Sequence, residues 1–278
     1  VIKIKKGLDI NLKGKASDVL LNGGKSESYA IVPDYYNGIL PKVVAKVGEK
    51  VKAGSVLMID KNRPEIKFVS PVSGEVTAVN RGEKRKVLSI VVKPDAQIEY
   101  EEFGKKNVAS LQGAEVKEVL LNAGMWPFIK QRPYDIVAAP LDTPRDIFVS
   151  AFYSAPLAPN FDFIVKGQEA DFQTGLNALA KLTNGKVYVG VRSGSVVSGM
   201  KGVEIVEVEG PHPAANVGVQ INHIKPVNKG EVVWTVNPAD VIVIGRLFNK
   251  GVADFSRMVA ITGSETTERG YVKTISGC

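Results

Sequence analysis

The sequence predicts a multidomain α/β protein, and three observations support this fold class. Residues 39–93 read as short strands separated by glycines, and no helical periodicity interrupts them. After about residue 100, segments with helical spacing alternate with strand-like segments, which is typical of a mostly parallel sheet. The length of 278 residues exceeds what one small core usually holds, so we expect at least two domains.

An N-terminal β region is expected over residues 1–100. Within it, "VGEKVKAGSVL" at 47–57 and "SPVSGEV" at 70–76 resemble the runs that flank the modified hairpin of lipoyl and biotinyl domains. Glycines permit the tight turns of such a unit, and a proline suits the edge of its sheet. We therefore predict a lipoyl/biotinyl-like, all-β barrel-sandwich unit here.

The same stretch lacks the signature of a swinging arm. In the biotinyl domains that it resembles, the modified lysine lies midway between the leucine and the proline, which are Leu57 and Pro71 here. The midpoint is Pro64, and Lys61 and Lys67 lie three residues to either side without the usual flanking residues. We therefore expect a lipoyl/biotinyl-like fold without a modified lysine. A carrier protein modified at Lys61 or Lys67 remains a rival hypothesis.

The second domain is expected over residues 101–257. Residues 114–124 and 168–182 place apolar side chains at helical spacing, and Asn237 and Gly251 suit the two ends of a third helix. Strands alternate with these helices, which predicts a doubly wound, Rossmann-like α/β domain. Residues 258–278 become strand-like again and indicate the start of a third domain.

The loops of this domain predict neither a nucleotide site nor a catalytic centre. No GxGxxG motif occurs, and "VLLNGGKS" at 19–26 has Val19 where a phosphate loop needs its first glycine. "VRSGSVVSG" at 191–199 could cradle a phosphate or cap a helix, and we expect a cap or a plain loop. His212 in "GPHPAAN" is a candidate acid–base group, although no Asp or Cys lies beside it in the sequence. No catalytic residue is assigned.

Cysteine and histidine are too few for a metal centre. Cys278 is the single cysteine, and the two histidines, His212 and His223, match no zinc spacing. The formal net charge is +7, with basic clusters near the N-terminus and in "RGEKRK" at 81–86. Neither cluster is interleaved with aromatic residues, so nucleic acid is not expected as a partner. An anionic membrane face, an acidic partner or a solvated surface all remain open.

Two segments combine aromatic side chains with prolines and polar groups. Residues 125–136, "MWPFIKQRPYDI", also carry Lys130, and residues 29–41, "YAIVPDYYNGILP", have a similar character. Packing of the rings in a local core is one reading. The functional reading is a flat surface with cationic donors that suits the head group of a quinone. The candidate quinone or interface residues are Trp126, Phe128, Arg132, Tyr134, Tyr35, Tyr36 and Asn37.

Several long motifs together resemble one known family. These are "IKIKKGLDI" at 2–10, the stretch 47–76, "VNRGEKRKVLSIVV" at 79–92, "LTNGKVYV" at 182–189 and "GPHPAANVGVQINHIKPVN" at 210–228. In this order they resemble the NqrA family, the A subunits of the sodium-translocating NADH:quinone reductases. The family continues beyond the position of Cys278, so residues 258–278 are expected to be the start of a truncated β-grasp-like domain.

The resemblance implies a role in a larger assembly. The family's complex lies in the bacterial inner membrane, oxidises NADH, reduces ubiquinone or a related quinone, and exports sodium. The A subunit is peripheral on the cytoplasmic face, docks on the membrane-embedded B subunit and contributes to quinone binding, while partner subunits carry the flavins and the iron–sulfur centre. The related flavin subunit of complex I uses a "GxGGAGFPT"-like loop that is absent here. No tightly bound cofactor is therefore expected on this chain. The rival is a structural assembly module, with the quinone bound elsewhere.

Overall fold

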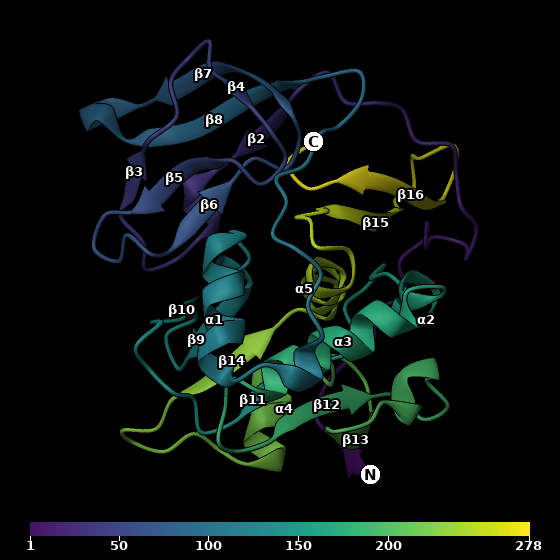
Figure 1. The fold of residues 1–278 in the computed structure, drawn as a ribbon. Helices are drawn as coiled ribbons and strands as arrows, with labels where there is room; N and C mark the ends of the chain where they lie inside the picture. Colours follow the sequence, from purple (N-terminus) through teal and green to yellow (C-terminus); the bar gives the residue numbers. More distant parts are fainter.

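The computed structural model describes residues 1–278 as two large units with smaller elements between them. A two-layer β unit lies at one end of the molecule and a seven-stranded sheet at the other (Figure 1). Helix α5 (Pro238–Lys250) and the hairpin of β15 (Ser256–Ile261) and β16 (Gly270–Ile275) lie between the two units. None of the helices has both the length and the apolar composition needed to cross a membrane.

The N-terminal unit consists of two antiparallel sheets, as the glycine-punctuated strands predict. The first has the order β2 (Tyr29–Ile31), β8 (Val87–Pro94), β7 (Gly74–Arg81) and β4 (Lys50–Val51). The second has the order β3 (Pro41–Val43), β5 (Val56–Asp60) and β6 (Lys67–Val69). Leu57, Phe68 and Val76 fill the space between the sheets. Gly74 is required where it lies, because a Cβ there would collide with the carbonyl oxygen of Lys93.

The C-terminal unit is built on one sheet with a parallel centre. Its strand order is β1 (Ile2–Lys3), β13 (Glu204–Glu209), β12 (Val187–Val191), β11 (Ile147–Ser150), β14 (Val233–Val236), β9 (Ile129–Arg132) and β10 (Ile136–Val137). The first five strands run parallel, and β9 and β10 are antiparallel to their neighbours. The predicted alternation of helix and strand is therefore confirmed, whereas the Rossmann-like assignment remains a prediction.

Helices cover both faces of this sheet. On one face, α1 (Gly113–Asn122), α3 (Glu169–Ala180) and α5 pack in the large core. On the other, α4 (Val217–Ile224) packs through Ile221 on Phe148 and Val233. The short α2 (Phe161–Val165) follows β11. The chain passes from β11 to β12 and β13 on one side and then to β14 on the other side of β11. The carboxyl ends of β11 and β14 thus form a topological switch point, where open α/β sheets usually bind ligands.

The predicted helix ends are confirmed at α5. The Asn237 side chain accepts a hydrogen bond from the Ala239 N–H at 3.0 Å, as an N-cap residue does. Gly251 ends the helix with a left-handed φ of 76°. In α3, Phe172, Leu176 and Leu179 are buried, which agrees with their helical spacing.

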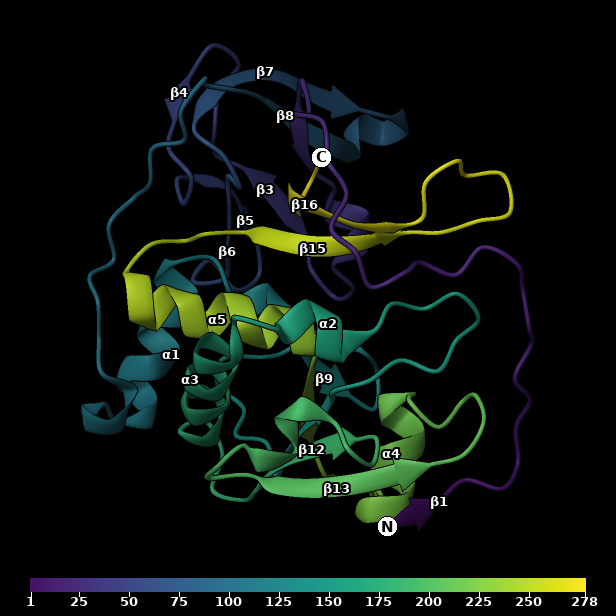
Figure 2. The same ribbon diagram turned by 90° about the vertical axis from the view of Figure 1, so that its right-hand side faces the viewer.

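The N-terminus does not stay within the β region predicted for residues 1–100. Strand β1 pairs with β13 at the edge of the α/β sheet, and residues 4–20 then run along the outside of the molecule as an extended strap (Figure 2). A two-residue strand has too few residues to show periodicity, so the sequence gives no sign of this pairing. The predicted boundary after residue 257 also differs, because it falls inside β15.

Helices α3 and α5 cross very closely, and two glycines make this possible. A Cβ on Gly175 would collide with the carbonyl oxygen of Val241, and a Cβ on Gly245 would collide with that of Asp171. The two helix backbones are therefore in direct contact at the crossing. A larger residue at either position would push α5 away from the sheet.

The substitution Gly245→Ala tests this crossing. We expect it to lower the free energy of unfolding by about 3 kcal/mol or more, because neither backbone can move without repacking the core. Gly218→Ala is the matched control, since a Cβ there meets nothing within 4 Å. The control should change stability by no more than about 1 kcal/mol, in the stabilising direction. Urea denaturation measures both, and equal stabilities of the two variants would contradict the tight crossing.

Candidate functional site

The two aromatic segments singled out in the sequence lie side by side. The Val137 N–H donates to the Asn37 carbonyl oxygen at 2.9 Å, and the Asn37 side chain reaches the Asp135 carbonyl oxygen at 3.5 Å. The Lys130 ammonium lies 5.2 Å from the centre of the Tyr36 ring, which is a cation–π contact. Residues 29–41 and 125–136 therefore form one surface, although about 90 residues separate them in the chain.

An aromatic cavity of about 300 Å³ opens where these segments meet the β15–β16 hairpin. We call it the junction cavity. Tyr36 packs edge-on against Phe68 with ring centres 4.7 Å apart, and Phe128 packs edge-on against Phe255 at 6.1 Å. All four rings line the cavity. Lys130, Asp240 and Arg257 are the charged residues of its lining, so a mostly apolar space contains a few polar groups.

The polar groups of the junction cavity have perturbed proton affinities. Burial lowers the pKa of Lys130, although Asp135 and Asp240 oppose the shift. Burial, with a contribution from Asp240, raises the pKa of Tyr36 to about 12. Burial also raises the pKa of Asp240, and the nearby Arg257 opposes this shift. Arg257 Nη2 donates a hydrogen bond to Asp240 Oδ1 at 3.0 Å. Tyr36 is therefore a neutral donor at physiological pH, and Lys130 gives up its proton more readily than an exposed lysine does.

A second cavity of about 620 Å³ lies at the carboxyl ends of β11 and β14. We call it the switch-point cavity. The N-terminal turns of α4 and α5 contribute to its wall, together with Thr235 of β14 and Arg132 of β9. Phe128, Lys130 and Asp240 line both this cavity and the junction cavity, so the two spaces are neighbours.

The predicted site residues lie in different environments. Tyr35, Tyr36 and Phe128 line the junction cavity, and Arg132 lines the switch-point cavity. Trp126 is 0% exposed: its Nε1–H donates to the Ala138 carbonyl oxygen at 2.8 Å, and its ring packs on Trp234. Tyr134 is 80% exposed and lines neither cavity. Asn37 connects the two segments through its backbone and side chain.

For Trp126, the structure agrees with the interpretation that the ring packs in a local core, and it does not support a ligand contact. Tryptophan is equally suited to a core and to a binding surface, and the sequence does not show which side of the turn is covered. The sequence also did not indicate Asp240, Phe255 or Arg257. These residues come from α5, from β15 and from the loop between them, more than 100 residues after the aromatic segments, and no local pattern distinguishes them.

The hairpin that would carry a swinging arm is docked on the second unit. Arg63 at its tip donates from Nη1 to the Val137 carbonyl oxygen at 3.1 Å and from Nη2 to that of Gly38 at 2.8 Å. Its Nε donates to the buried Asp60 carboxylate at 2.7 Å. Lys67 donates to the Asn122 side chain at 2.7 Å, at the end of α1. The tip therefore forms part of the wall between the units.

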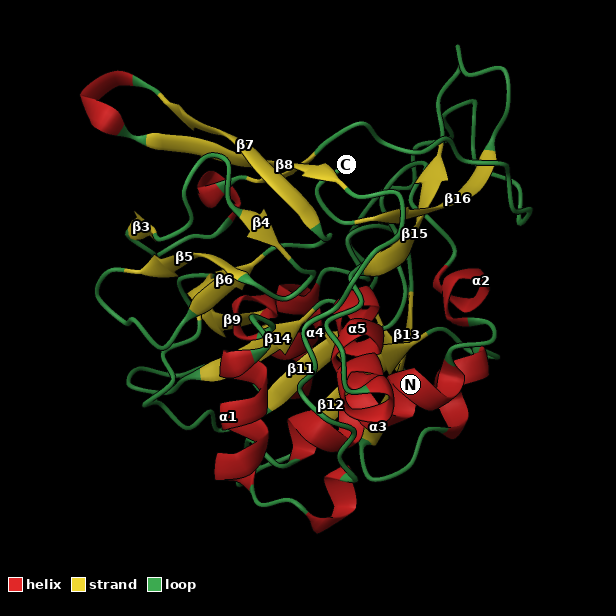
Figure 3. Ribbon diagram, turned by 45° about the horizontal axis from the view of Figure 1, so that its top comes forward, coloured by secondary structure: helices red, strands yellow, loops and turns green.

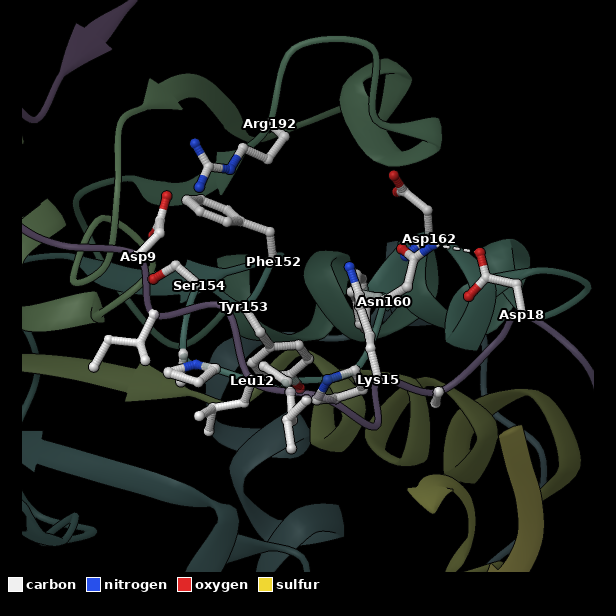
Figure 4. A pocket seen from close by; sticks show the side chains of 18 of the residues that line it. Asp9, Leu12, Lys15, Asp18, Phe152, Tyr153, Ser154, Asn160, Asp162 and Arg192 are labelled. Carbon is white, nitrogen blue, oxygen red and sulfur yellow. Dashed lines mark hydrogen bonds between the residues drawn. The ribbon is translucent and has the colours of Figure 1, made fainter. Parts of the chain in front are cut away.

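A third cavity, of about 580 Å³, lies between the strap and the loops after β11 and β12. Figure 4 shows its polar residues arranged around an open centre, with Asp9, Lys15 and Asp18 contributed by the strap. We call it the strap cavity. Most of its polar groups already bond within the protein: Asn160 donates to Asp18 at 2.8 Å, and the Ser195 hydroxyl donates to Asp162 at 2.6 Å. This leaves few groups free to bind a ligand.

The other sequence candidates have structural roles here. Ser195 caps the short helical turn Val196–Gly199, as expected, by accepting from the Val197 N–H. His212 Nδ1 lies 3.1 Å from the Ser154 hydroxyl oxygen, and the backbone N–H of His212 donates to Asp9. No group of three or more His, Cys, Asp or Glu side chains is arranged to hold a metal ion.

The substitution Arg63→Met tests the docking of the hairpin. It leaves the Asp60 carboxylate buried without its cation, so we expect the free energy of unfolding to fall by about 3–5 kcal/mol. Adding Asp60→Asn should recover part of this loss, because a neutral amide oxygen can still accept from the backbone N–H groups of Leu40 and Asn62. Urea denaturation of the single and double variants measures the coupling. Purely additive effects would show that the two side chains do not act as a pair.

Comparison with known proteins places the chain in a family. Residues 2–95 match the family model of the NqrA N-terminal barrel-sandwich hybrid domain, and residues 111–253 match that of the NqrA second alpha/beta domain. The chain is 38% identical to a Hahella chejuensis protein and 36% identical to proteins of Neisseria meningitidis serogroup A and Photorhabdus laumondii. Each of these relatives is named as the A subunit of a Na(+)-translocating NADH-quinone reductase, and the alignments cover 100% of this chain and 63% of each relative. The resemblance seen in the motifs is confirmed, and the chain belongs to the NqrA family.

Proposed function

We propose that this chain is a peripheral, quinone-binding subunit of a sodium-translocating NADH:quinone reductase. The complex would oxidise NADH, reduce a quinone and translocate sodium, as the names of the relatives suggest. In this proposal the acceptor is ubiquinone or a related quinone, and sodium is exported. The observation that carries the proposal is the junction cavity, where the two predicted aromatic segments meet around Lys130. The head group of the quinone would bind there.

The chemistry of the junction cavity suits a quinone ring. Aromatic side chains can pack on the faces and edges of a planar ring, and they exclude water around it. The two carbonyl oxygens of a quinone are acceptors, and Lys130, Tyr36 and Arg257 are donors in the lining. Once the quinone is reduced, its hydroxyl groups become donors, and the Asp240 carboxylate is a matching acceptor. The lining can therefore bind both forms of the ring.

The electrons would come from partner subunits. In this proposal, flavins and an iron–sulfur centre on other subunits reduce the quinone, and this chain supplies binding and orientation. It would dock on the membrane-embedded B subunit at the cytoplasmic face of the bacterial inner membrane. Tyr35 and Tyr134 are 78% and 80% exposed, and exposed tyrosines of this kind suit a protein interface. We propose that they belong to the docking face.

Photo-crosslinking tests the quinone site. A quinone with a photoreactive group on its ring should label residues 29–41 or 125–136, both in the assembled complex and in this chain alone, and excess quinone should compete. Labelling in the complex alone would show that the membrane partner completes the site. No competed label on this chain in either sample would contradict the proposal.

The substitution Lys130→Met, used in the same crosslinking experiment, tests whether Lys130 contributes to quinone binding. The variant keeps an apolar side chain of similar length but removes the donor and the cation–π contact with Tyr36. Loss of one hydrogen bond from a charged donor should weaken quinone binding about tenfold or more. Lys42→Met, on the exposed face of β3, is the matched control and should label like the unchanged protein. Equal labelling of the two variants would remove Lys130 from the site.

One observation favours the assembly role as a second function. The β7–β8 hairpin projects from the body of the molecule and ends in a short helical turn (Figure 3). Its tip carries Arg81, Lys84, Arg85 and Lys86, and among these Lys86 pairs with Asp34 at 2.6 Å. A projecting basic tip suits an acidic surface on another component of the complex.

The double substitution Arg81→Gln and Lys84→Gln tests this role. We expect weaker association with the rest of the complex and a smaller effect of added salt on that association, because two exposed cations are lost. Quinone affinity of the isolated chain should not change, since the tip lines neither cavity. Unchanged association at low salt would exclude the hairpin as a docking element.

A further inference from the structure

Helix α4 begins at the switch-point cavity with free backbone donors. Asn216 is its N-cap residue, but its side chain makes no capping hydrogen bond. The Asn216 carbonyl oxygen accepts from the N–H groups of Val219 and Gln220, whereas those of Val217 and Gly218 have no partner in the chain. A Cβ on Gly218 would meet nothing within 4 Å, so open space lies beside this end of the helix. Free N–H groups at a helix N-terminus attract anions.

The hydroxyl of a mostly buried threonine faces the same cavity and has no partner in the protein. Thr235 lines the cavity and is 5% exposed, and its side chain makes no hydrogen bond within the protein. Along β14 it lies on the same face as Val233, which packs on Ile221 of α4. The hydroxyl is therefore on the α4 side of the sheet. Because the hydroxyl opens onto the cavity and bonds to no protein group, it is available to a ligand.

Cations lie beside Thr235 on the neighbouring strand, because Lys130 of β9 pairs with Thr235 in the sheet and Arg132 pairs with Val233. Arg132 has an Nε atom without a hydrogen bond, 3.4 Å from the half-exposed Asp135 carboxylate. Lys130 lies next to it in the lining, with no carboxylate within 4 Å of its ammonium group. The Asp240 carboxylate in the same lining is already engaged by Arg257. Asp135 is thus the one carboxylate that an incoming anion would displace, and its 3.4 Å contact with Arg132 Nε is not a hydrogen bond.

We propose that the switch-point cavity binds a small organic molecule through a phosphate or carboxylate group. The anionic group would accept hydrogen bonds from the Val217 and Gly218 N–H groups and from the Thr235 hydroxyl, with Arg132 and Lys130 balancing its charge. The cavity volume of about 620 Å³ leaves space for the organic part beside Phe152 and Tyr153. The strap cavity is a weaker candidate, because its polar groups already bond to one another. This site adjoins the proposed quinone site and shares Lys130 with it, but Val217, Gly218 and Thr235 do not line the junction cavity.

Anion titrations of the purified 278-residue chain test the proposal. Inorganic phosphate, succinate and chloride are compared at matched ionic strength, with the melting temperature and calorimetric titration as readouts. We expect phosphate or succinate to raise the melting temperature above its value in chloride, because a ligand that binds only the folded state stabilises it. A larger response to phosphate would identify phosphate esters as the ligand class, and a larger response to succinate would identify carboxylates. Equal melting temperatures in all three salts would overturn the proposal.

Two variants locate the site. Thr235→Val is isosteric and should weaken binding of the responding anion about tenfold, since it removes one hydrogen bond to a charged group. Gly218→Asp places a carboxylate at the first turn of α4, so it should keep or raise the melting temperature in chloride but abolish the response to the added anion. Gly24→Asp is the matched control, because a Cβ there also meets nothing within 4 Å, and it should respond like the unchanged chain. A full response from Gly218→Asp would overturn the proposal.

Discussion

The buried guanidinium of Arg246 holds together the middle of this molecule. It is 4% exposed, and it donates from Nη1 to the carbonyl oxygens of Asp254 and Ser256 and from Nη2 to the Gln168 side chain. Asp171 and Asp254 lie within 4 Å of it as counter-charges. A buried cation is tolerated only when it is paired and fully hydrogen-bonded, so this arrangement fixes the start of α3, the end of α5 and the turn into β15 relative to one another.

The junction cavity depends on this arrangement. Phe255 and Arg257, which line the cavity, flank Ser256, whose carbonyl oxygen and hydroxyl both bond to Arg246. Asp240, which binds Arg257, lies in the first turn of the helix that carries Arg246. The charges that face the cavity are therefore positioned from the core of the α/β unit, whereas the aromatic rings of Tyr36 and Phe68 come from the β unit. Neither unit forms this cavity alone.

Much of the fold could be predicted because its signals are local. The cap at Asn237, the stop at Gly251 and the glycine-punctuated strands each involve a few neighbouring residues. The candidate site was only partly predictable. The two aromatic segments were recognised, but their contact with each other and the contribution of Asp240 and Arg257 depend on pairings across long stretches of chain. Aromatic composition also did not distinguish Trp126, which is in the core, from Phe128, which lines both cavities.

The strap has a mechanical consequence for the molecule. The Leu8 N–H bonds to the His212 carbonyl oxygen beside the α/β sheet, and the Leu21 N–H bonds to that of Tyr271 in the small hairpin. The residues between these anchors run along the surface (Figure 2), with tight turns at Ile10–Leu12 and Ser17–Val19. The strap therefore ties the sheet to the hairpin at both of its ends, so that separating the two would break both hydrogen bonds.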